Sequence, residues 1–307
     1  MRVFVLCNSD LLGFPLIARL NERKDLCGIG ILKRYQKHLM PGLKSMGIEQ
    51  KDIHAFSKAD WIPELEKALR TYNPDVVWVL TFPWKIPASL LRIPAQGFVN
   101  FHFGLLPKYK GIDPIFWHIK NKDSGGLTIH LMNESIDEGP IVFQEQINIV
   151  PGENYGLYAK RMGEQSAGFF DRILEVLEQK PMEFLQLASS EVIDKKPGLD
   201  DITIDWKNQS ADDIEWTVNA CNPKYGGAWA RLGGEEVQLV EVTPINLANP
   251  VEVEPGQIVH ADATYGVVVA CKNNGYLRIT VARLSHGFVS GVRLFNMGIL
   301  PGQKFES

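Results

Sequence analysis

An amide and an imidazole stand two residues apart in an apolar stretch that ends at a turn containing Pro and Gly. Asn100 and His102 lie in the segment 97–111. Because side chains at positions i and i+2 of a strand point to the same face of a sheet, we expect these two groups to project together. The best third member is Asp137, in the loop 135–140 between two expected strands. An Asn amide can donate to a developing oxyanion, a His can carry a proton, and an Asp can orient the imidazole and stabilise its protonated form.

The sequence motifs of covalent catalysis are missing from this chain. It contains no G-x-S-x-G segment, so no Ser is set up as the nucleophile of a strand–turn–helix elbow. The three groups therefore suit transfer of an acyl group directly to an external nucleophile. A lone His in a strand is more often a structural hydrogen-bonding residue, so the residue types alone leave that alternative open.

Strand and helix patterns alternate over the first hundred residues. Apolar runs without polar interruption are typical of buried parallel strands, and apolar residues at helical spacing lie between them. We expect strands at 2–7, 26–32, 53–56, 76–80 and 98–103, and helices at 11–20, 64–72 and 88–91. The alternation predicts an α/β fold with a doubly wound, mainly parallel, Rossmann-like sheet. Ligands bind such sheets at the C-terminal ends of the strands, where Asn100, His102 and the aromatic loop 82–87 should lie.

The rest of the chain changes from mixed to mainly β patterns. We expect a helix at 114–120, strands at 126–132 and 141–149, and one long helix at 155–179. A polar stretch at 183–209 follows, then a helix at 211–221, short strands at 227–232, 237–242, 256–261, 266–271 and 276–281, and a short helix at 292–297. Short strands at close spacing predict a small OB-like β-barrel. The expected divisions are a catalytic domain at 1–185, a linker at 186–209 and a C-terminal domain at 210–307.

Composition places the chain among ordinary globular proteins. Its 307 residues are 45% hydrophobic and 22% charged, and the formal net charge of −4 gives no overall basic field for nucleic acid. The four cysteines form no C-x-x-C pair, which favours reduced thiols in a cytoplasmic protein. The first residues do not have the layout of a signal peptide, and no apolar run reaches the length needed to span a membrane. We therefore expect the cytoplasm, with no membrane partner.

Two separated motifs carry a family resemblance. The run Asn100-Phe101-His102-Phe103-Gly104-Leu105-Leu106-Pro107-Lys108-Tyr109-Lys110-Gly111 resembles the N-x-H-x-S-L-L-P-x-[FYW]-[KR]-G motif of the folate-dependent formyltransferases. The run Ile136-Asp137-Glu138-Gly139-Pro140-Ile141 resembles their L-D-T-G-D-I loop. The chain is similar to the methionyl-tRNA formyltransferases over its whole length, through matches at 205–206, 226–229, 255–258 and 300–304.

The resemblance implies transfer of a formyl group from 10-formyltetrahydrofolate to a primary amine. No metal site is expected, because the seven histidines are scattered and form no cluster with ligand spacing. Position in the motif would make Asn100 the oxyanion-binding amide, His102 the acid and base, and Asp137 the residue that orients it. The loops that cradle the pterin, largely through backbone groups, would contain Phe82, Pro83, Trp84, Lys85, Ile86, Ile136, Glu138, Gly139 and Pro140. The expected substrate-binding residues are Gly104, Leu105, Leu106, Pro107, Lys110 and Asp113.

The chain departs from the family pattern close to His102. Gly104 stands where the family has Ser, Phe103 adds an apolar ring, and Asp113 falls where a small apolar residue is usual. The basic segment 33–44 is shorter than the insertion with which the methionyl-tRNA formyltransferases grip the tRNA acceptor arm. It is either a solvated surface or a contact for an anionic group such as a phosphate or a glutamyl tail.

Three readings of function remain open at this point. The first is formylation of a charged initiator tRNA, and the second is the same chemistry on a small amine, such as an amino-sugar nucleotide. The third, from another class, is an inert binding protein that keeps the fold. The presence of Asn100, His102 and Asp137 favours an enzyme over the third reading.

Overall fold

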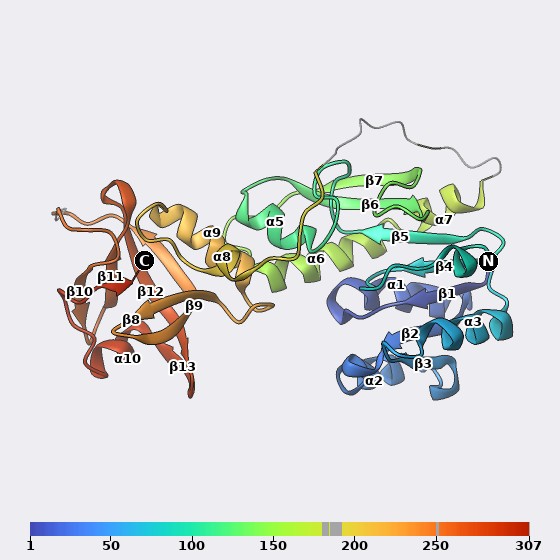
Figure 1. Cartoon of the computed structure of the whole chain (residues 1–307), viewed down its shortest axis with the longest axis horizontal. Coiled ribbons are helices and arrows are strands. Elements are labelled where there is room, and N and C mark those ends of the chain that lie inside the picture. Colours follow the sequence, from blue (N-terminus) through green and yellow to red (C-terminus); the bar gives the residue numbers. More distant parts are fainter. Residues whose placement is uncertain (180–183, 185–191, 250–251, 307) are drawn as a thin grey trace. The chain divides into compact units, whose positions relative to one another are not determined.

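The structure is a computed structural model that describes residues 1–179, 184, 192–249 and 252–306 (Figure 1). The chain divides into two compact units. The first comprises Met1–Pro114, Ser124–Asn148 and Ala159–Asp194, and the second comprises Ile115–Asp123, Ile149–Tyr158 and Lys195–Ser307. The domain boundaries expected from the sequence stay a prediction, and residues 186–191 of the expected linker lie outside the described residues.

A seven-stranded sheet forms the centre of the first unit. Its strands are β1 (Val3–Leu6), β2 (Leu26–Leu32), β3 (Ile53–Phe56), β4 (Val76–Val79), β5 (Phe98–His102), β6 (Gly125–Leu131) and β7 (Ile141–Ile147). They lie in the order β3-β2-β1-β4-β5-β6-β7 (Figure 1). The first five strands pair in parallel, whereas β6 runs antiparallel to β5 and β7 antiparallel to β6. The predicted doubly wound, mainly parallel sheet is confirmed.

Helices connect the parallel strands of this sheet. They are α1 (Asp10–Glu22), α2 (Gln36–Ser45), α3 (Trp61–Tyr72) and α4 (Ala88–Leu91), with short 3-10 turns at Lys33–Tyr35 and Gln50–Asp52. Helix α1 begins where the Ser9 hydroxyl accepts a hydrogen bond from the Leu12 amide, and α3 ends at Asn73, whose φ of 45° is left-handed. The basic segment 33–44 forms the 3-10 turn Lys33–Tyr35 and most of α2.

The long helix predicted at 155–179 is interrupted. It forms α6 (Tyr155–Gly168) and α7 (Phe170–Glu178), separated by Phe169 with φ −88° and ψ 3°. The Phe169 amide is shared between the carbonyls of Gln165 (3.1 Å) and Ser166 (3.2 Å). The Ser166 hydroxyl also bonds back to the Met162 carbonyl at 2.6 Å, which is a known cause of helix bending. The apolar periodicity continues across this break, so it does not reveal the interruption.

A curled antiparallel sheet forms most of the second unit. The strands are β8 (Ala228–Leu232), β9 (Glu235–Ile245), β10 (Ile258–Asp262), β11 (Gly266–Ala270), β12 (Tyr276–Leu284), β13 (Gly287–Ser290) and β14 (Phe305–Glu306). They follow the order β10-β11-β12-β9-β8-β14, with β13 beside β12. Gln257 and Lys304 pair across the two ends of this order, and the Ile258 amide donates to the Gln303 carbonyl at 2.8 Å. The sheet therefore curls back on itself, and the predicted β-barrel is confirmed.

Helices of the second unit are short. They are α5 (Pro114–Lys120), α8 (Leu199–Ile202), α9 (Ala211–Cys221) and α10 (Gly291–Asn296). Helix α9 begins with a capping box, in which Ser210 and Asp213 each bond the other's backbone amide. Among the described residues, no helix combines the length and the apolar run needed to cross a membrane.

The two faces of strand β5 differ: one carries polar side chains, and the packing of the other, apolar face holds the strand in place. Asn100 and His102 share one face, and Phe101 points to the other. The Phe101 side chain is 1% exposed, and its ring lies 4.8 Å from that of Trp78 on β4. The packing of Phe101 therefore fixes the position of β5 in the sheet, and with it the positions of Asn100 and His102.

Replacing Phe101 by Ala should lower the free energy of unfolding by about 3–5 kcal/mol, because a buried ring is replaced by a cavity. Urea denaturation of the purified variant measures this. Ile62→Ala on α3 is the control, since its side chain is 40% exposed and should change stability by about 0.5 kcal/mol or less. Equal effects of the two substitutions would show that Phe101 does not anchor β5.

Candidate active site

The amide of Asn100 lies between two acceptors. Its Nδ2 donates to Oδ1 of Asp137 at 3.2 Å and to Nε2 of His130 at 3.1 Å. Antiparallel pairing of β5 with β6 sets His130 directly opposite Asn100. Nδ1 of His130 donates to the Leu131 carbonyl at 3.1 Å, which leaves the lone pair of the neutral ring on Nε2, toward Asn100. The structure thus adds a second imidazole to the expected group.

Asp137 is the point at which these contacts meet. It lies in the loop between β6 and β7 with a left-handed φ of 52°. Its Oδ2 accepts from the Gly111 amide at 2.9 Å and lies 3.5 Å from Nδ1 of His102, and its Oδ1 lies 3.4 Å from Nε2 of His130. Burial alone would raise the pKa of this carboxyl, but His130, His102 and the Gly111 amide oppose it and hold the pKa at about 2. Asp137 is therefore ionised at neutral pH.

His102 is buried and held from both sides. Its side chain is 5% exposed, and Nε2 donates to the Tyr109 carbonyl at 2.8 Å. A carbonyl only accepts, so Nε2 carries a hydrogen and the lone pair of the neutral ring lies on Nδ1, facing Asp137. Burial lowers the pKa of His102 despite the opposing effect of Asp137. The imidazole is neutral at pH 7, and the nitrogen that takes up a proton is Nδ1, where Asp137 stabilises the resulting charge.

Sequence reasoning missed His130, although one signal was present. Thr128 and His130 occupy alternate positions of an otherwise apolar strand, so both point to the face that holds Asn100. Thr128 fixes the neighbouring turn, because its hydroxyl donates to the Gly104 carbonyl at 2.6 Å and accepts from the Leu106 amide at 3.1 Å. A period-two pattern of polar residues in a strand beside β5 could have identified both.

The residues expected to bind substrate lie on the turn after β5. Leu106 is buried, and Lys110 is 5% exposed with its ammonium paired to the Glu138 carboxylate. Gly104 packs so closely that a Cβ there would lie 2.7 Å from Nε2 of His102. Leu105, Pro107 and Asp113 are half-buried along the same turn. The turn therefore encloses His102, and its contact with a substrate stays a prediction.

The residues expected to cradle a pterin divide between core and surface. The rings of Phe82, Trp84 and Trp61 form a cluster with centroids 5.3–5.4 Å apart. Ile86 and Gly139 are buried, whereas Pro83, Lys85, Ile136, Glu138 and Pro140 are exposed. Because two of the aromatic side chains pack on each other, the backbone of this loop is what remains available to a ligand.

A pocket adjoins these loops. It has a volume of about 490 Å³ and is lined by Ala88, Leu91, Arg92, Met132, Asn133, Glu134 and Ser135. Ser135 is two residues before Asp137, so the pocket borders the loop that carries the carboxylate. The sequence singled out the two loops but not these lining residues, because pairing of β5 with β6 is what brings α4 near the end of β6.

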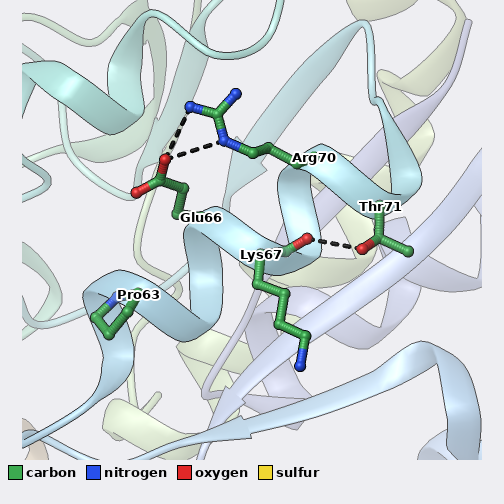
Figure 2. A pocket seen from close by; sticks show the side chains of 5 residues that line it. All are labelled: Pro63, Glu66, Lys67, Arg70 and Thr71. Carbon is green, nitrogen blue, oxygen red and sulfur yellow. Dashed lines mark hydrogen bonds and ion pairs between the residues drawn. The ribbon is translucent and has the colours of Figure 1, made fainter.

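A second hollow of about 440 Å³ lies along α3 and is formed by that helix alone (Figure 2). Its lining residues are Pro63, Glu66, Lys67, Arg70 and Thr71. Figure 2 shows that Arg70 binds Glu66, with Nη2 to Oε1 at 2.8 Å, one turn along the helix. None of the residues that surround Asp137 lines this hollow, so it is separate from the candidate site.

Comparison with known proteins identifies the family. A profile described as formyl transferase matches residues 32–174, and one described as formyl transferase, C-terminal domain matches residues 199–299. Methionyl-tRNA formyltransferase of Geobacter metallireducens is 30% identical over 245 residues, which cover 76% of this chain and 75% of the relative. The chain belongs to the formyl transferase family. The methionyl-tRNA formyltransferase of Burkholderia ambifaria is 29% identical over 305 residues, 95% of this chain and 90% of the relative.

A solved structure shares the formyl transferase fold over nearly the whole chain. HypX from Aquifex aeolicus, in complex with tetrahydrofolic acid, matches with a TM-score of 0.69 and 18% identity, covering 96% of this chain and 47% of HypX. This chain thus spans about half the length of HypX. Members of the formyl transferase family are transferases of one-carbon groups, and this protein is an enzyme of that class.

The pKa of His102 should lie below the ordinary His value of about 6.5, because burial outweighs the attraction of Asp137. The ring would then be half protonated only below pH 6.5. In Asp137→Asn the stabilising charge is lost, so the pKa should fall further. An NMR titration of the 15N-labelled imidazole measures both values. Asp171→Asn on the surface is the control, and a higher His102 pKa in Asp137→Asn would contradict the assignment.

Gly104→Ala should displace the His102 ring from the Tyr109 carbonyl, because the added Cβ lies 2.7 Å from Nε2 and 2.9 Å from Cβ of Pro114. Loss of one neutral hydrogen bond worth roughly 0.5–1.5 kcal/mol should lower the transfer rate by about two- to tenfold. Steady-state kinetics and the Nε2 chemical shift measure it. Gly168→Ala is the control, since its Cβ meets nothing within 4 Å. An unchanged Nε2 signal would show that this space is not required.

Proposed function

We propose that this protein transfers the formyl group of 10-formyltetrahydrofolate to a primary amine. The observation that carries the proposal is the grouping of Asn100, His102 and Asp137 at the end of β5. The Asn100 amide donates to the ionised Asp137 carboxylate, and Nδ1 of the neutral His102 imidazole lies 3.5 Å from it. These groups can stabilise an oxyanion, accept a proton and stabilise the protonated imidazole, and the uncatalysed attack of an amine on a formyl group has none of these aids.

The reaction can be followed through these side chains. The amine nitrogen bonds to the formyl carbon, and the carbonyl oxygen becomes an oxyanion that accepts a hydrogen bond from Nδ2 of Asn100. The amine proton passes to Nδ1 of His102, where Asp137 stabilises the imidazolium. The bond between the formyl carbon and N10 of the folate then breaks, and N10 takes the proton from His102. The products are the N-formyl amine and tetrahydrofolate.

Both hydrogens of the Asn100 amide are engaged before substrate arrives, at 3.1 Å to His130 and 3.2 Å to Asp137. A formyl oxygen therefore has to replace one of these acceptors. Neither bond is short. A hydrogen bond to the negatively charged oxygen of the transition state is stronger than the bond to His130 or the 3.2 Å bond to Asp137 that it replaces, so the exchange favours the transition state.

The donor side of the site is supported by two observations. The tetrahydrofolate complex of HypX comes from a protein with the same fold, and the family is folate-dependent. In this chain the pocket of about 490 Å³ borders the Asp137 loop and combines apolar lining from Leu91 and Met132 with polar lining from Arg92 and Asn133. A flat heterocycle with polar edges fits such a lining.

The acceptor we propose first is a charged initiator tRNA, as the names of the methionyl-tRNA formyltransferase relatives suggest. One observation favours a small amine as the second candidate. Residues 195–307 carry ten Lys and Arg against thirteen Asp and Glu, so this part of the chain has no excess of positive charge for phosphates. No disulfide forms among the described residues, and we propose the cytoplasm as the compartment, without a membrane partner.

Formyl transfer from 10-formyltetrahydrofolate should be measured with charged initiator tRNA and with an amino-sugar nucleotide. We expect turnover with one of them, and Asn100→Ala should reduce kcat by about 10²–10³-fold, because an oxyanion donor is lost. Asn121→Ala on an exposed turn is the control. A salt-sensitive KM for the tRNA would support the first acceptor.

Turnover of the small amine alone would eliminate the tRNA. Unchanged turnover in His102→Ala would overturn the catalytic assignment of His102. Absence of turnover by the wild-type protein with either acceptor would leave the inert binding protein as the remaining reading.

A further inference from the structure

Residues 192–194 lie beside the turn that follows β5. Asp194 pairs in parallel with Gly111: its amide donates to the Lys110 carbonyl at 2.6 Å, and its carbonyl accepts from the Ile112 amide at 3.0 Å. This is a strand pairing of a single residue, made by the last residue of the first unit. It joins parts of the chain more than eighty residues apart in sequence.

The pairing determines where the Gly111 amide points. In a strand pairing, the backbone groups of successive residues point to opposite sides. Lys110 and Ile112 turn their bonding groups toward Asp194, so the N–H of Gly111 points the other way, to Oδ2 of Asp137 at 2.9 Å. Asp194 and Asp137 thus hold the same residue from its two sides.

Gly111 is the residue that such a close approach demands. Its φ is 111°, and a Cβ built on it would lie 2.4 Å from the Asp194 carbonyl oxygen and 2.8 Å from Cγ2 of Ile193. A larger residue would push the two segments apart. The absence of a side chain is therefore a requirement of this pairing as well as of the turn.

Three successive residues of the turn each hold a part of the catalytic group. The Tyr109 carbonyl accepts from His102, the Lys110 ammonium pairs with Glu138 next to Asp137, and the Gly111 amide donates to Asp137 itself. We call residues 109–111 the carrier segment. The Lys110 carbonyl of this segment accepts from the Asp194 amide, so a shift at Asp194 would reach both His102 and Asp137.

We propose that Asp194, acting through its backbone, is a positioning residue of the active site that holds the carrier segment 109–111 against His102 and Asp137. The catalytic role of Asp194 rests on the proposed function, but the contacts that Asp194 makes do not. The chain leaving the first unit is in this way a component of the catalytic site and more than a connection to the barrel.

Asp194→Pro tests this, because Pro has no amide to donate to the Lys110 carbonyl. We expect kcat for formyl transfer to fall at least about tenfold while KM for the folate donor stays within about threefold, since the donor pocket is not touched. Asp194→Ala keeps the amide and should recover most of the rate lost in Asp194→Pro. Leu199→Pro is the matched control: it places a Pro at the first residue of α8, at a side chain that is 66% exposed.

A second variant covers the case in which Asp194→Pro does not fold. Gly111→Ala brings a Cβ against the Asp194 carbonyl and should give the same loss of kcat. Gly47→Ala is its control, because Gly47 also has a positive φ (77°) but meets nothing within 4 Å.

A titration of the free protein separates this inference from the proposed function. The carboxyl of Asp137, followed by 13C NMR without substrate, should have a pKa above the wild-type value of about 2 in Asp194→Pro and Gly111→Ala, because the Gly111 amide no longer stabilises the charge. This readout stands even if wild-type protein transfers no formyl group.

A wild-type kcat and an unmoved Asp137 titration in these variants would overturn the inference. An Asp194→Ala variant as slow as Asp194→Pro would overturn it too, because the side chain and not the backbone would then be responsible.

Discussion

A buried, ionised carboxylate is the constraint on which the site depends. A carboxylate removed from water costs several kcal/mol unless donors replace its hydration. Asp137 meets this requirement with two donors, the amide of Asn100 and the backbone amide of Gly111, and the imidazoles of His102 and His130 lie 3.5 and 3.4 Å from its oxygens. Both donors must reach this one carboxylate, so the loop after β6, the end of β5 and the turn beyond it have little freedom to move independently.

The antiparallel edge of the sheet makes this convergence possible. After the connection that contains α5, β6 runs antiparallel beside β5 and sets His130 opposite Asn100. The loop to β7 then folds back over the strand end, close enough that a Cβ on Gly139 would lie 1.6 Å from the Leu131 carbonyl oxygen. The parallel part of the sheet supplies a rigid β5, and the antiparallel part brings its partners to it.

Sequence reasoning predicted the elements better than their contacts. The parallel strands, the barrel and the association of Asn100 with His102 follow from local patterns, because periodicity identifies buried faces. His130 was missed because strand pairing, not spacing, brings it to Asn100, and the helix break at Phe169 was missed because an apolar stripe continues through it. The role of the Gly111 amide has no sequence signature either, since backbone donors look alike in every residue.

The departure at Gly104 has a structural consequence that offsets the lost hydroxyl of the family's Ser. Without a Cβ at this position, the His102 ring fits beneath the turn and donates from Nε2 to the Tyr109 carbonyl. That bond selects the tautomer whose free lone pair, on Nδ1, faces Asp137. A hydroxyl beside the ring could accept or donate and would allow either tautomer, whereas a carbonyl can only accept. The substitution therefore removes a contact and at the same time restricts proton transfer to the nitrogen that the carboxylate can stabilise.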